Sequence, residues 1–577
     1  MGNYNKSPEV IVKGTHKAWI GYQDIVNEIK KCIDGRKEQI ILGIECYPGV
    51  RYDEIIEGLI KPLDADQVIH SDNLAYNVEK ITQMIERNLT NDRVFGVMSN
   101  HKLHEFFDEN KLTIARNELS NKKLTIIYGV GASIVQQPDI LIYADLARWE
   151  IQGRYRSQEL ANWRSDNYSE DILRKYKRGY FFEWRIADRQ KKQLFEQIDY
   201  LLDTNQKDNP KLVSGENYRS ALIQVVETPF RLVPFFDEGI WGGQWMKEKL
   251  SLDPNVKNFA WGFDGVPEEN SIYLNFSGTR LEIPSINVVF AHPVELLGDK
   301  VHARFGTEFP IRFDFLDTMN GGNLSLQVHP LTEYIQDEFG MHYTQDESYY
   351  ILEGSDDASV YLGVKEGIKK EDLLNGLERA ELGEIVFPDE KYINKLPAKK
   401  HDHYLIPAGT IHCSGRNTVI LEISATPYIF TFKLWDWGRV GLDGLPRPVH
   451  LNHGKNNILI ERDEEWVKEN LVNRTETIET GKGWTEEKTG LHENQFIRTH
   501  RHWFSEKVYH STHNSVNMLN LVEGKEAIVE SPAEAFDPFI VHYAETFIIP
   551  ASLKEYTIRP YGQSDGETIA TIKAFVE

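Results

Sequence analysis

The pattern of hydrophobic positions predicts two differently built regions. In the N-terminal part, short apolar runs alternate with stretches of helical spacing. The run at 39–44 is followed by a Gly/Pro turn and by helical spacing over 53–59, which is typical of a strand–turn–helix unit. Two further buried strands are predicted at 124–129 and 139–145. We therefore predict an α/β domain with a parallel sheet over residues 1–224.

From about residue 225 the pattern changes to many short strands separated by Gly, Pro and Asn turns, with examples at 285–290 and 311–315. Closely spaced short strands favour a β-sandwich or jelly roll. Near 365–383 the spacing is helical, which we interpret as a helical insertion into the β-rich region. The chain is therefore expected to be multidomain.

A faint internal repeat divides the β-rich region in two. The segment 406–412, Ile-Pro-Ala-Gly-Thr-Ile-His, has a counterpart at 549–555, Ile-Pro-Ala-Ser-Leu-Lys-Glu. Each is a strand that ends in Pro-Ala before a turn, but the second copy has Glu555 in place of the histidine. We interpret the region as a duplicated barrel, with a metal-bearing half at 225–455 and a metal-free half at 456–577.

Candidate metal ligands follow from strand periodicity. In the run Leu-Ser-Leu-Gln-Val-His-Pro, alternation places Ser325, Gln327 and His329 on one polar face. Glu347 opens an aromatic, β-rich run, and His412 follows a Pro-x-Gly turn that can fix an imidazole at the start of a strand. Gln, His, Glu and His suit a borderline divalent metal such as zinc.

Ordinary structural roles compete with this interpretation. A single histidine after Pro-x-Gly is more often a structural residue, and Gln327 alone would indicate only a hydrogen bond to a neighbour. A second pair, His500 and His502, has the His-x-His spacing of a metal site, but no matching Glu and Pro-x-Gly-x-x-His follow it. We expect that pair to be satisfied by protein neighbours rather than by a metal.

Composition narrows the class of partner. The formal charge of −23, from 65 basic and 88 acidic residues, argues against nucleic acid or an anionic membrane surface. Three widely spaced cysteines indicate no disulfide framework. No apolar run approaches the roughly 18 residues of a membrane span, and no signal region opens the sequence. We expect a soluble, cytoplasmic protein.

Several motifs occur together in a family order. Glu347 and Gly354 have the E-x6-G spacing of cupins, and Pro407-x-Gly409-x-x-His412 fits their second motif. With Gln-Val-His-Pro at 327–330 and Ile-Trp-Gly-Gly at 240–243, residues from about 227 to 577 resemble a type I phosphomannose isomerase of the cupin superfamily.

That resemblance implies a double cupin with Zn²⁺ held by Gln327, His329, Glu347 and His412. It also implies conversion of mannose 6-phosphate to fructose 6-phosphate through a cis-enediol, whose negative charge a metal can neutralise.

Two positions depart from the family. Lys433 stands where the resemblance expects a catalytic arginine, and lysine lacks the planar fork that binds two oxygens. Gln345 replaces a substrate-binding lysine. We take Lys433 as the candidate catalytic residue, and Ser325, Gln345 and Arg439 as candidate substrate-binding residues, with Arg439 toward the phosphate. The alternative is a non-catalytic metal-binding cupin that senses a sugar phosphate.

The N-terminal layout resembles the nucleoside-kinase-like branch of phosphate-binding-loop folds, with residues 43–51 at the position of the loop. A working loop needs G-x-x-x-x-G-K-[ST], because the lysine neutralises phosphate and the hydroxyl holds magnesium. Here five residues separate the glycines, and Val50 and Arg51 occupy the Lys and Ser/Thr positions. We expect a non-catalytic structural or docking domain that contacts a nucleotide or a protein; an active kinase is the less favoured alternative.

Overall fold

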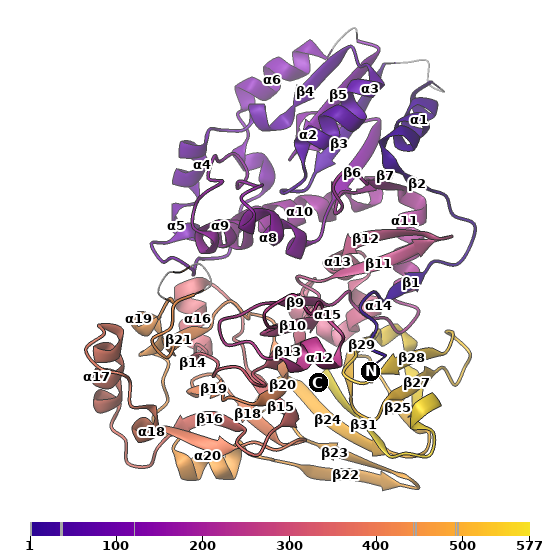
Figure 1. Ribbon diagram of the computed structural model, residues 1–577. Helices are drawn as coiled ribbons and strands as arrows, with labels where there is room; N and C mark the ends of the chain where they lie inside the picture. The colour runs from indigo at the N-terminus through magenta and orange to yellow at the C-terminus, as the bar shows by residue number, and fades with distance from the viewer. Residues whose placement is uncertain are drawn as a thin grey trace. The chain divides into compact units, whose positions relative to one another are not determined.

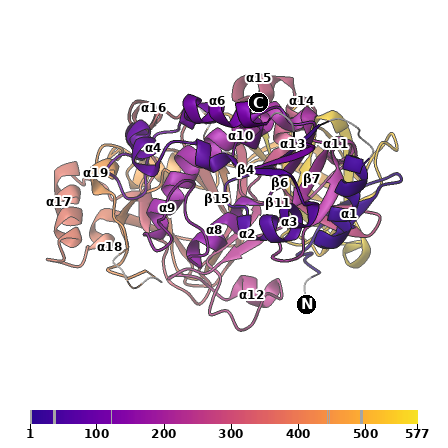
Figure 2. The ribbon, with the colours of Figure 1, turned by 90° about the horizontal axis from the view of Figure 1, so that it is seen from above.

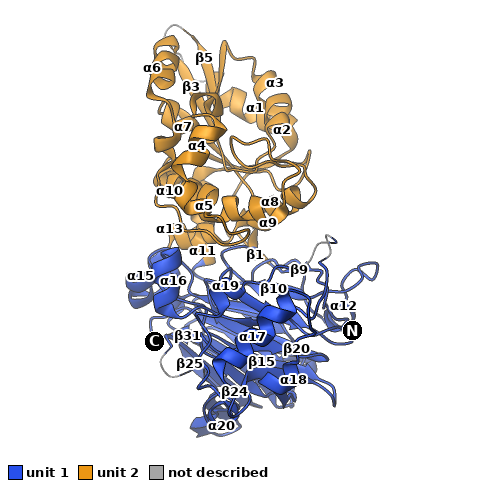
Figure 3. Cartoon of the chain, turned by 90° about the vertical axis from the view of Figure 1, so that its left-hand side faces the viewer, with its two compact units in different colours: residues 1–8, 226–270, 293–577 blue, residues 9–225, 271–292 orange. Residues whose placement is uncertain are grey.

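The computed structural model describes residues 3–34, 39–119, 122–441, 444, 447–490, 492 and 495–577. The chain is multidomain and rich in sheets, as predicted. It forms two compact units (Figures 1 and 3). The units are discontinuous in sequence. Unit 1 comprises Met1–Pro8, Val226–Asn270 and Pro293–Glu577, and unit 2 comprises Glu9–Val225 and Ser271–His292. Residues 271–292, which the predicted division places in the metal-bearing half, therefore belong to unit 2.

Unit 2 is built on a seven-stranded mixed sheet in the order β2-β8-β7-β6-β3-β5-β4. The five neighbouring strands β7, β6, β3, β5 and β4 are parallel to one another. Strand β8 pairs antiparallel with β7, and β2 pairs antiparallel with β8. The strands are β2 (Ala18–Ile20), β3 (Ile40–Cys46), β4 (Gln67–His70), β5 (Leu124–Gly129), β6 (Ile140–Asp145), β7 (Tyr200–Asp203) and β8 (Lys211–Ser214). The strands expected at 39–44, 124–129 and 139–145 are β3, β5 and β6.

Helices cover this sheet because their apolar stripes need burial. Helix α1 (Gly21–Asp34) buries Ile25, Val26, Ile29 and Ile33 and contacts β2 and β8. Helix α11 (Gly215–Val225) contacts β8 and β7 at the same end of the sheet (Figure 2). The remaining longer helices of unit 2 are α4 (Val78–Met84), α6 (Glu109–Glu118), α8 (Arg148–Arg156), α9 (Ile172–Arg178) and α10 (Trp184–Leu194).

The segment 271–292 forms a hairpin and a helix. Strands β11 (Ser271–Phe276) and β12 (Thr279–Pro284) pair with each other, and β1 (Glu9–Ile11) adds to β11. The strand predicted at 285–290 is wrong in type, since α13 (Ile286–Ala291) occupies these residues. A short apolar run does not distinguish a strand from a buried helix. Packing against α11 decides in favour of the helix.

The first part of unit 1 is an antiparallel two-sheet structure. A six-stranded sheet has the order β18-β15-β20-β13-β10-β9, and a five-stranded sheet has the order β17-β16-β19-β14-β21. The strands are β9 (Phe235–Asp237), β10 (Trp261–Gly265), β13 (Ile311–Asp317), β14 (Leu326–Val328), β15 (Glu347–Gly354), β16 (Ser359–Val364), β17 (Ile393–Pro397), β18 (His403–Ile406), β19 (His412–Ser414), β20 (Thr418–Ala425) and β21 (Phe432–Trp435). The predicted helical insertion is α17 (Lys370–Glu381), followed by α18 (Asp389–Tyr392).

A second pair of sheets follows, in the orders β22-β23-β24-β31-β26-β29 and β25-β30-β27-β28. The two sheets share one apolar core, which includes Phe504, Leu519 and Phe547. The strands are β22 (Glu476–Gly481), β23 (Trp484–Lys488), β24 (Ile497–Phe504), β25 (Val508–Ser511), β26 (Asn517–Glu523), β27 (Glu526–Glu530), β28 (Phe539–His542), β29 (Thr546–Ile549), β30 (Glu555–Pro560) and β31 (Ile569–Val576). Among the described residues, no helix combines the length and apolar character that crossing a bilayer requires.

Candidate metal centre

Three buried side chains of unit 1 converge on one point. The carboxylate of Glu347 faces two imidazoles, with Oε2 3.0 Å from Nε2 of His329 and Oε1 2.9 Å from Nε2 of His412. Their potential ligand atoms all lie within 4.8 Å of one another. Over the described part of the chain, this is the only group of three or more His, Cys, Asp or Glu with that geometry.

Strand register brings the three residues together. Glu347 begins β15, His412 begins β19, and His329 directly follows β14. A tight turn before β19 completes the arrangement, because Gly409 donates its backbone N–H to the carbonyl of His329 at 3.0 Å. Gly409 has φ +87°, and a side chain there would collide with Leu331 and Leu459. The Pro-x-Gly motif thus serves backbone geometry that only glycine adopts without strain.

A backbone carbonyl sets the tautomer of His412. Its Nδ1 lies 2.9 Å from the carbonyl oxygen of Thr410, and a nitrogen in that position carries the proton in order to donate it. Nε2 is then left with its lone pair toward Glu347, as a metal ligand requires.

Gln327 lies beside the same three residues, and Ser325 precedes it by two positions. Gln327 is paired with His412 across the sheet, and its side-chain amide nitrogen lies 3.3 Å from Nε2 of His412. The oxygen and nitrogen of an amide are interchangeable by a flip, so Gln327 can present either atom to the cluster. Ser325 is buried, and its hydroxyl has no hydrogen-bond partner.

The donor set fits a divalent cation. Nε2 of His329 and Oε1 of Glu347 are buried, and no hydrogen bond satisfies either atom. Buried polar atoms without partners are costly, so such atoms converging on one point indicate a ligand. Two imidazole nitrogens, a carboxylate and an amide oxygen are ligands that zinc accepts.

Three further charged residues next to the cluster were missed by the sequence analysis. Arg312 and Asp314 on β13 and Glu422 on β20 are all buried. Arg312 donates to Glu422 at 2.9 Å and lies 3.1 Å from Asp314. Their alternation with apolar residues is that of an ordinary half-exposed strand, so the sequence offers no signal that these charges are internal.

The buried charges around the cluster suit a divalent cation. The carboxylates of Glu347, Asp314 and Glu422, if all ionised, carry three negative charges, and Arg312 carries one positive charge. A buried excess of two negative charges is strongly unfavourable. A divalent cation at the imidazole–carboxylate cluster would balance it.

Without a cation, the acidic groups respond through their pKa values. Burial raises the pKa of Asp314 to about 6, with Arg312 opposing the shift and Glu347 adding to it. Burial, with Asp314 and Glu347 nearby, raises the pKa of Glu422 well above its usual range. Burial alone would also raise the pKa of Glu347, but His329 and His412 outweigh it and hold that pKa below its usual range.

Gln345 connects Glu347 to this charged interior. Its amide nitrogen donates to Oε2 of Glu347 at 2.9 Å and to Oε1 of Glu422 at 3.3 Å. The glutamine at the position of the expected lysine therefore holds the Glu347 carboxylate in place rather than adding a charge.

Lys433 and Arg439, the other two residues predicted for the site, lie in different surroundings. Lys433 on β21 is paired across the sheet with Gln327, so its side chain projects to the face that carries Gln327 and His412. Arg439 is tied to neighbouring loops, since it forms an ion pair with Asp436 and donates to the carbonyl of Asn323 at 2.8 Å.

His500 and His502 form a separate cluster in the C-terminal sheets. Both lie near Oε1 of Glu486, with Nδ1 of His500 at 2.7 Å and Nε2 of His502 at 3.1 Å. Lys573 is 3.9 Å from the same oxygen. A lysine next to the carboxylate favours a protein-satisfied pair over a second metal site.

Comparison with known proteins gives two separate likenesses. Residues 21–227 match a family described as a domain of unknown function (DUF8485). Mannose-6-phosphate isomerase ManA of Bacillus subtilis is 27% identical over 226 residues, which is 39% of this chain and 65% of that protein. Probable mannose-6-phosphate isomerase GmuF of the same organism is 22% identical over 334 residues, which is 57% of this chain and 96% of that protein.

Two solved structures also align with this chain. The crystal structure of mannose 6-phosphate isomerase from Bacillus subtilis has a TM-score of 0.49 and 18% identity, covering 60% of this chain and 99% of that one. A mutant of phosphomannose isomerase from Salmonella typhimurium has a TM-score of 0.45 and 14% identity, covering 61% of this chain and all of that one.

Proposed function

We propose that this chain is a zinc-dependent aldose–ketose isomerase that interconverts mannose 6-phosphate and fructose 6-phosphate through a cis-enediol. The observation that carries the proposal is the buried cluster of His329, Glu347 and His412, with Gln327 beside it. The named relatives support the reaction, since one is named a mannose-6-phosphate isomerase and the other a probable one.

Gln327, His329, Glu347 and His412 would hold the metal. Bound there, zinc supplies a redox-inert positive charge that neutralises oxygens as negative charge develops on them. The side chains of this chain do the rest. Thr410 keeps the Nε2 lone pair of His412 directed inward, and Gln345 holds Glu347 in place.

Lys433 is the candidate for charge stabilisation or proton movement between C1 and C2. Its pairing with Gln327 across the sheet supports this role, and an ammonium can stabilise an enediolate oxygen. Ser325 offers a hydroxyl to a substrate oxygen. For Arg439 to bind the phosphate, the nitrogens not used by Asp436 and Asn323 would have to reach it.

The direct test is an isomerase assay on the full-length, metal-loaded chain. Mannose 6-phosphate should yield fructose 6-phosphate, and His412→Ala should abolish turnover by removing a ligand. Absence of turnover in the metal-loaded wild type would contradict the proposal.

One observation favours a second candidate, a non-catalytic cupin that binds metal and a sugar phosphate. Gln345 removes a cation from the position where the resemblance expects lysine, and in its place bonds Glu347 and Glu422. Saturable binding of hexose phosphates without turnover, over a panel of aldose and ketose phosphates, would identify this candidate.

A further inference from the structure

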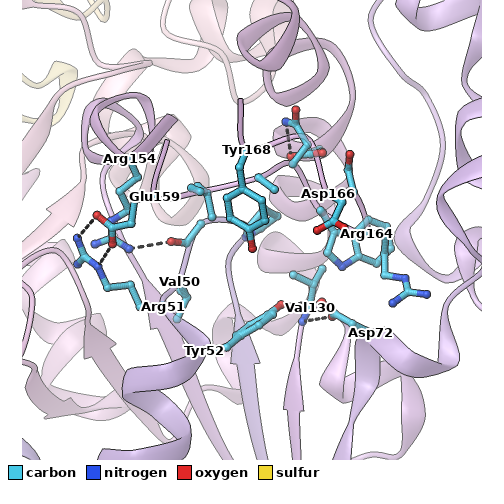
Figure 4. Close-up of a pocket in the computed structure, with 18 of the residues that line it drawn as sticks. Val50, Arg51, Tyr52, Asp72, Val130, Arg154, Glu159, Arg164, Asp166 and Tyr168 are labelled. Atoms are coloured by element: carbon cyan, nitrogen blue, oxygen red, sulfur yellow. Dashed lines mark hydrogen bonds and ion pairs between the residues drawn. The ribbon is translucent and has the colours of Figure 1, made fainter. Parts of the chain in front are cut away.

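Unit 2 contains a pocket of about 740 Å³ that the proposed isomerase does not use (Figure 4). Its floor is made by residues that follow three parallel strands: Val50 and Arg51 after β3, Asp72 after β4, and Val130 after β5. The loop that runs from Glu159 to Tyr168 covers another side. The volume is that of a small-molecule site.

The topology of the sheet marks this place as a binding site. In chain order, β4 and β5 lie on one side of β3, and β6 and β7 lie on the other. After β3, the chain therefore adds strands first on one side of β3 and then on the other. In open parallel sheets, ligands bind outside the carboxyl ends of the strands where the strand order switches in this way.

The arginines of the pocket are already paired with protein groups. Arg51 forms ion pairs with Glu54, Glu150 and Glu159. Arg154 is buried and donates to Glu150 at 2.8 Å and to the carbonyl of Gly49 at 2.7 Å. Nη1 of Arg51 is buried without a hydrogen-bond partner, but a phosphate group that reached it would lie against these carboxylates.

The overall charge of the lining also disfavours an anion. Six Asp and Glu side chains line the pocket, against the four cations Arg51, Arg154, Arg164 and Lys207. Arg51 stands in the loop after β3, where a phosphate-binding loop would carry its lysine or hydroxyl. The pocket is therefore suited to hydrogen-bond donors that carry no phosphate.

Asp72 provides a buried acceptor at the floor. Its Oδ2 accepts from the hydroxyl of Tyr52 at 2.9 Å, and its Oδ1 accepts from the backbone N–H of Val130 at 3.1 Å. A carboxylate has about four acceptor positions. These two donors, together with the His70 ring nitrogen 3.6 Å from Oδ2, leave part of that capacity for the hydroxyl groups of a ligand.

Aromatic rings face this acceptor. Figure 4 shows the ring of Tyr168 projecting into the pocket, with Tyr52 and Asp72 on the opposite side. Tyr168 is 47% exposed, so its ring has a face on which a ligand can pack. Aromatic rings and carboxylates together suit a ring that has an apolar face and a rim of hydroxyls.

We propose that the pocket of unit 2 binds an unphosphorylated sugar ring, with Asp72 accepting its hydroxyls and Tyr168 packing on its face. The inference is independent of the isomerase reaction, because every residue it uses lies in unit 2.

The test is calorimetric titration of the full-length chain with D-mannose, D-fructose, their 6-phosphates and adenosine. A free hexose should bind saturably. Tyr168→Ala and Asp72→Asn should each weaken that binding by at least about tenfold, as expected for loss of one aromatic or hydrogen-bonded contact. Tyr168 is exposed, so its replacement leaves the core of unit 2 intact.

Two controls separate this pocket from the metal centre. Tyr509→Ala changes a tyrosine of unit 1 that is 74% exposed, and should leave hexose binding unchanged. His412→Ala should also leave it unchanged. The proposal is overturned if no free hexose binds saturably, if hexose binding is lost in His412→Ala but kept in Tyr168→Ala, if a hexose 6-phosphate binds more tightly than its hexose at a site that depends on Tyr168, or if adenosine alone binds.

Discussion

The side-chain amide of Gln345 donates a 2.9 Å hydrogen bond to Oε2 of Glu347, the carboxylate oxygen that also faces His329. Groups that hydrogen-bond a metal-ligand carboxylate orient it, and their loss commonly weakens metal binding.

Replacing Gln345 by alanine should therefore weaken zinc binding by about 10–100-fold. Chelator competition on the purified chain measures this directly. Gln563→Ala, at an exposed position of unit 1, is the matched control. Equal zinc affinity in Gln345→Ala and wild type would show that Glu347 is held by other contacts.

Arg312→Met should destabilise unit 1. The change leaves Asp314 and Glu422 buried without their cation, and breaking a buried pair from one side costs about 3–5 kcal/mol in the free energy of unfolding. Urea denaturation of the metal-free chain measures the change, and Arg416→Met at an exposed position is the control. An unchanged midpoint for Arg312→Met would contradict the role of the arginine in this network.

Lys433→Met should lower kcat by about 10²–10⁴-fold, the range for a group that assists charge or proton movement in the transition state. Zinc content should stay at the wild-type level, because lysine is not a ligand. Lys433→Arg keeps the charge and should retain part of the activity. Full kcat in Lys433→Met would remove Lys433 from the mechanism.

Glu282 gives unit 2 a predicted pH dependence. Burial, with Asp203 nearby, raises its pKa from 4.5 to about 7. A raised pKa means that the folded protein binds the proton more tightly than the unfolded chain. The stabilisation from this group is therefore complete below pH 4.5 and is lost as pH rises toward 7.

The loss amounts to about 3 kcal/mol over that interval. Glu282→Gln should remove it, so that unit 2 of the variant melts higher than wild type at pH 8 and close to it at pH 4.5. Thermal denaturation at the two pH values measures the difference, with exposed Glu118→Gln as the control. Identical pH profiles for Glu282→Gln and wild type would contradict the prediction.

The sequence was informative where chemistry depends on local spacing. Gln327 and His329 have side chains that can bind a metal, and their spacing puts them on one face of a strand. The Pro-x-Gly turn before His412 predicts a glycine in the left-handed region, and Gly409 adopts that conformation. The structure brings His329, Glu347 and His412 together. Such patterns are readable because strand periodicity and turn geometry are local properties.

The sequence did not show which segments far apart in the chain pack together. Arg312 and Asp314 alternate with apolar residues, as on a half-exposed strand, but every residue of β13 is buried. The helix over 286–291 and the return of 271–292 to unit 2 depend on packing between segments far apart in sequence. Periodicity indicates which side chains share a face, but not what covers that face.

The most direct test of the central claim is to measure zinc content and hexose 6-phosphate isomerisation on one sample of the full-length chain. The account predicts about one zinc per chain and interconversion of mannose 6-phosphate and fructose 6-phosphate, with both lost in His412→Ala. A chain that holds zinc and binds these sugars, but turns over no member of an aldose and ketose phosphate panel, would contradict the proposed isomerase.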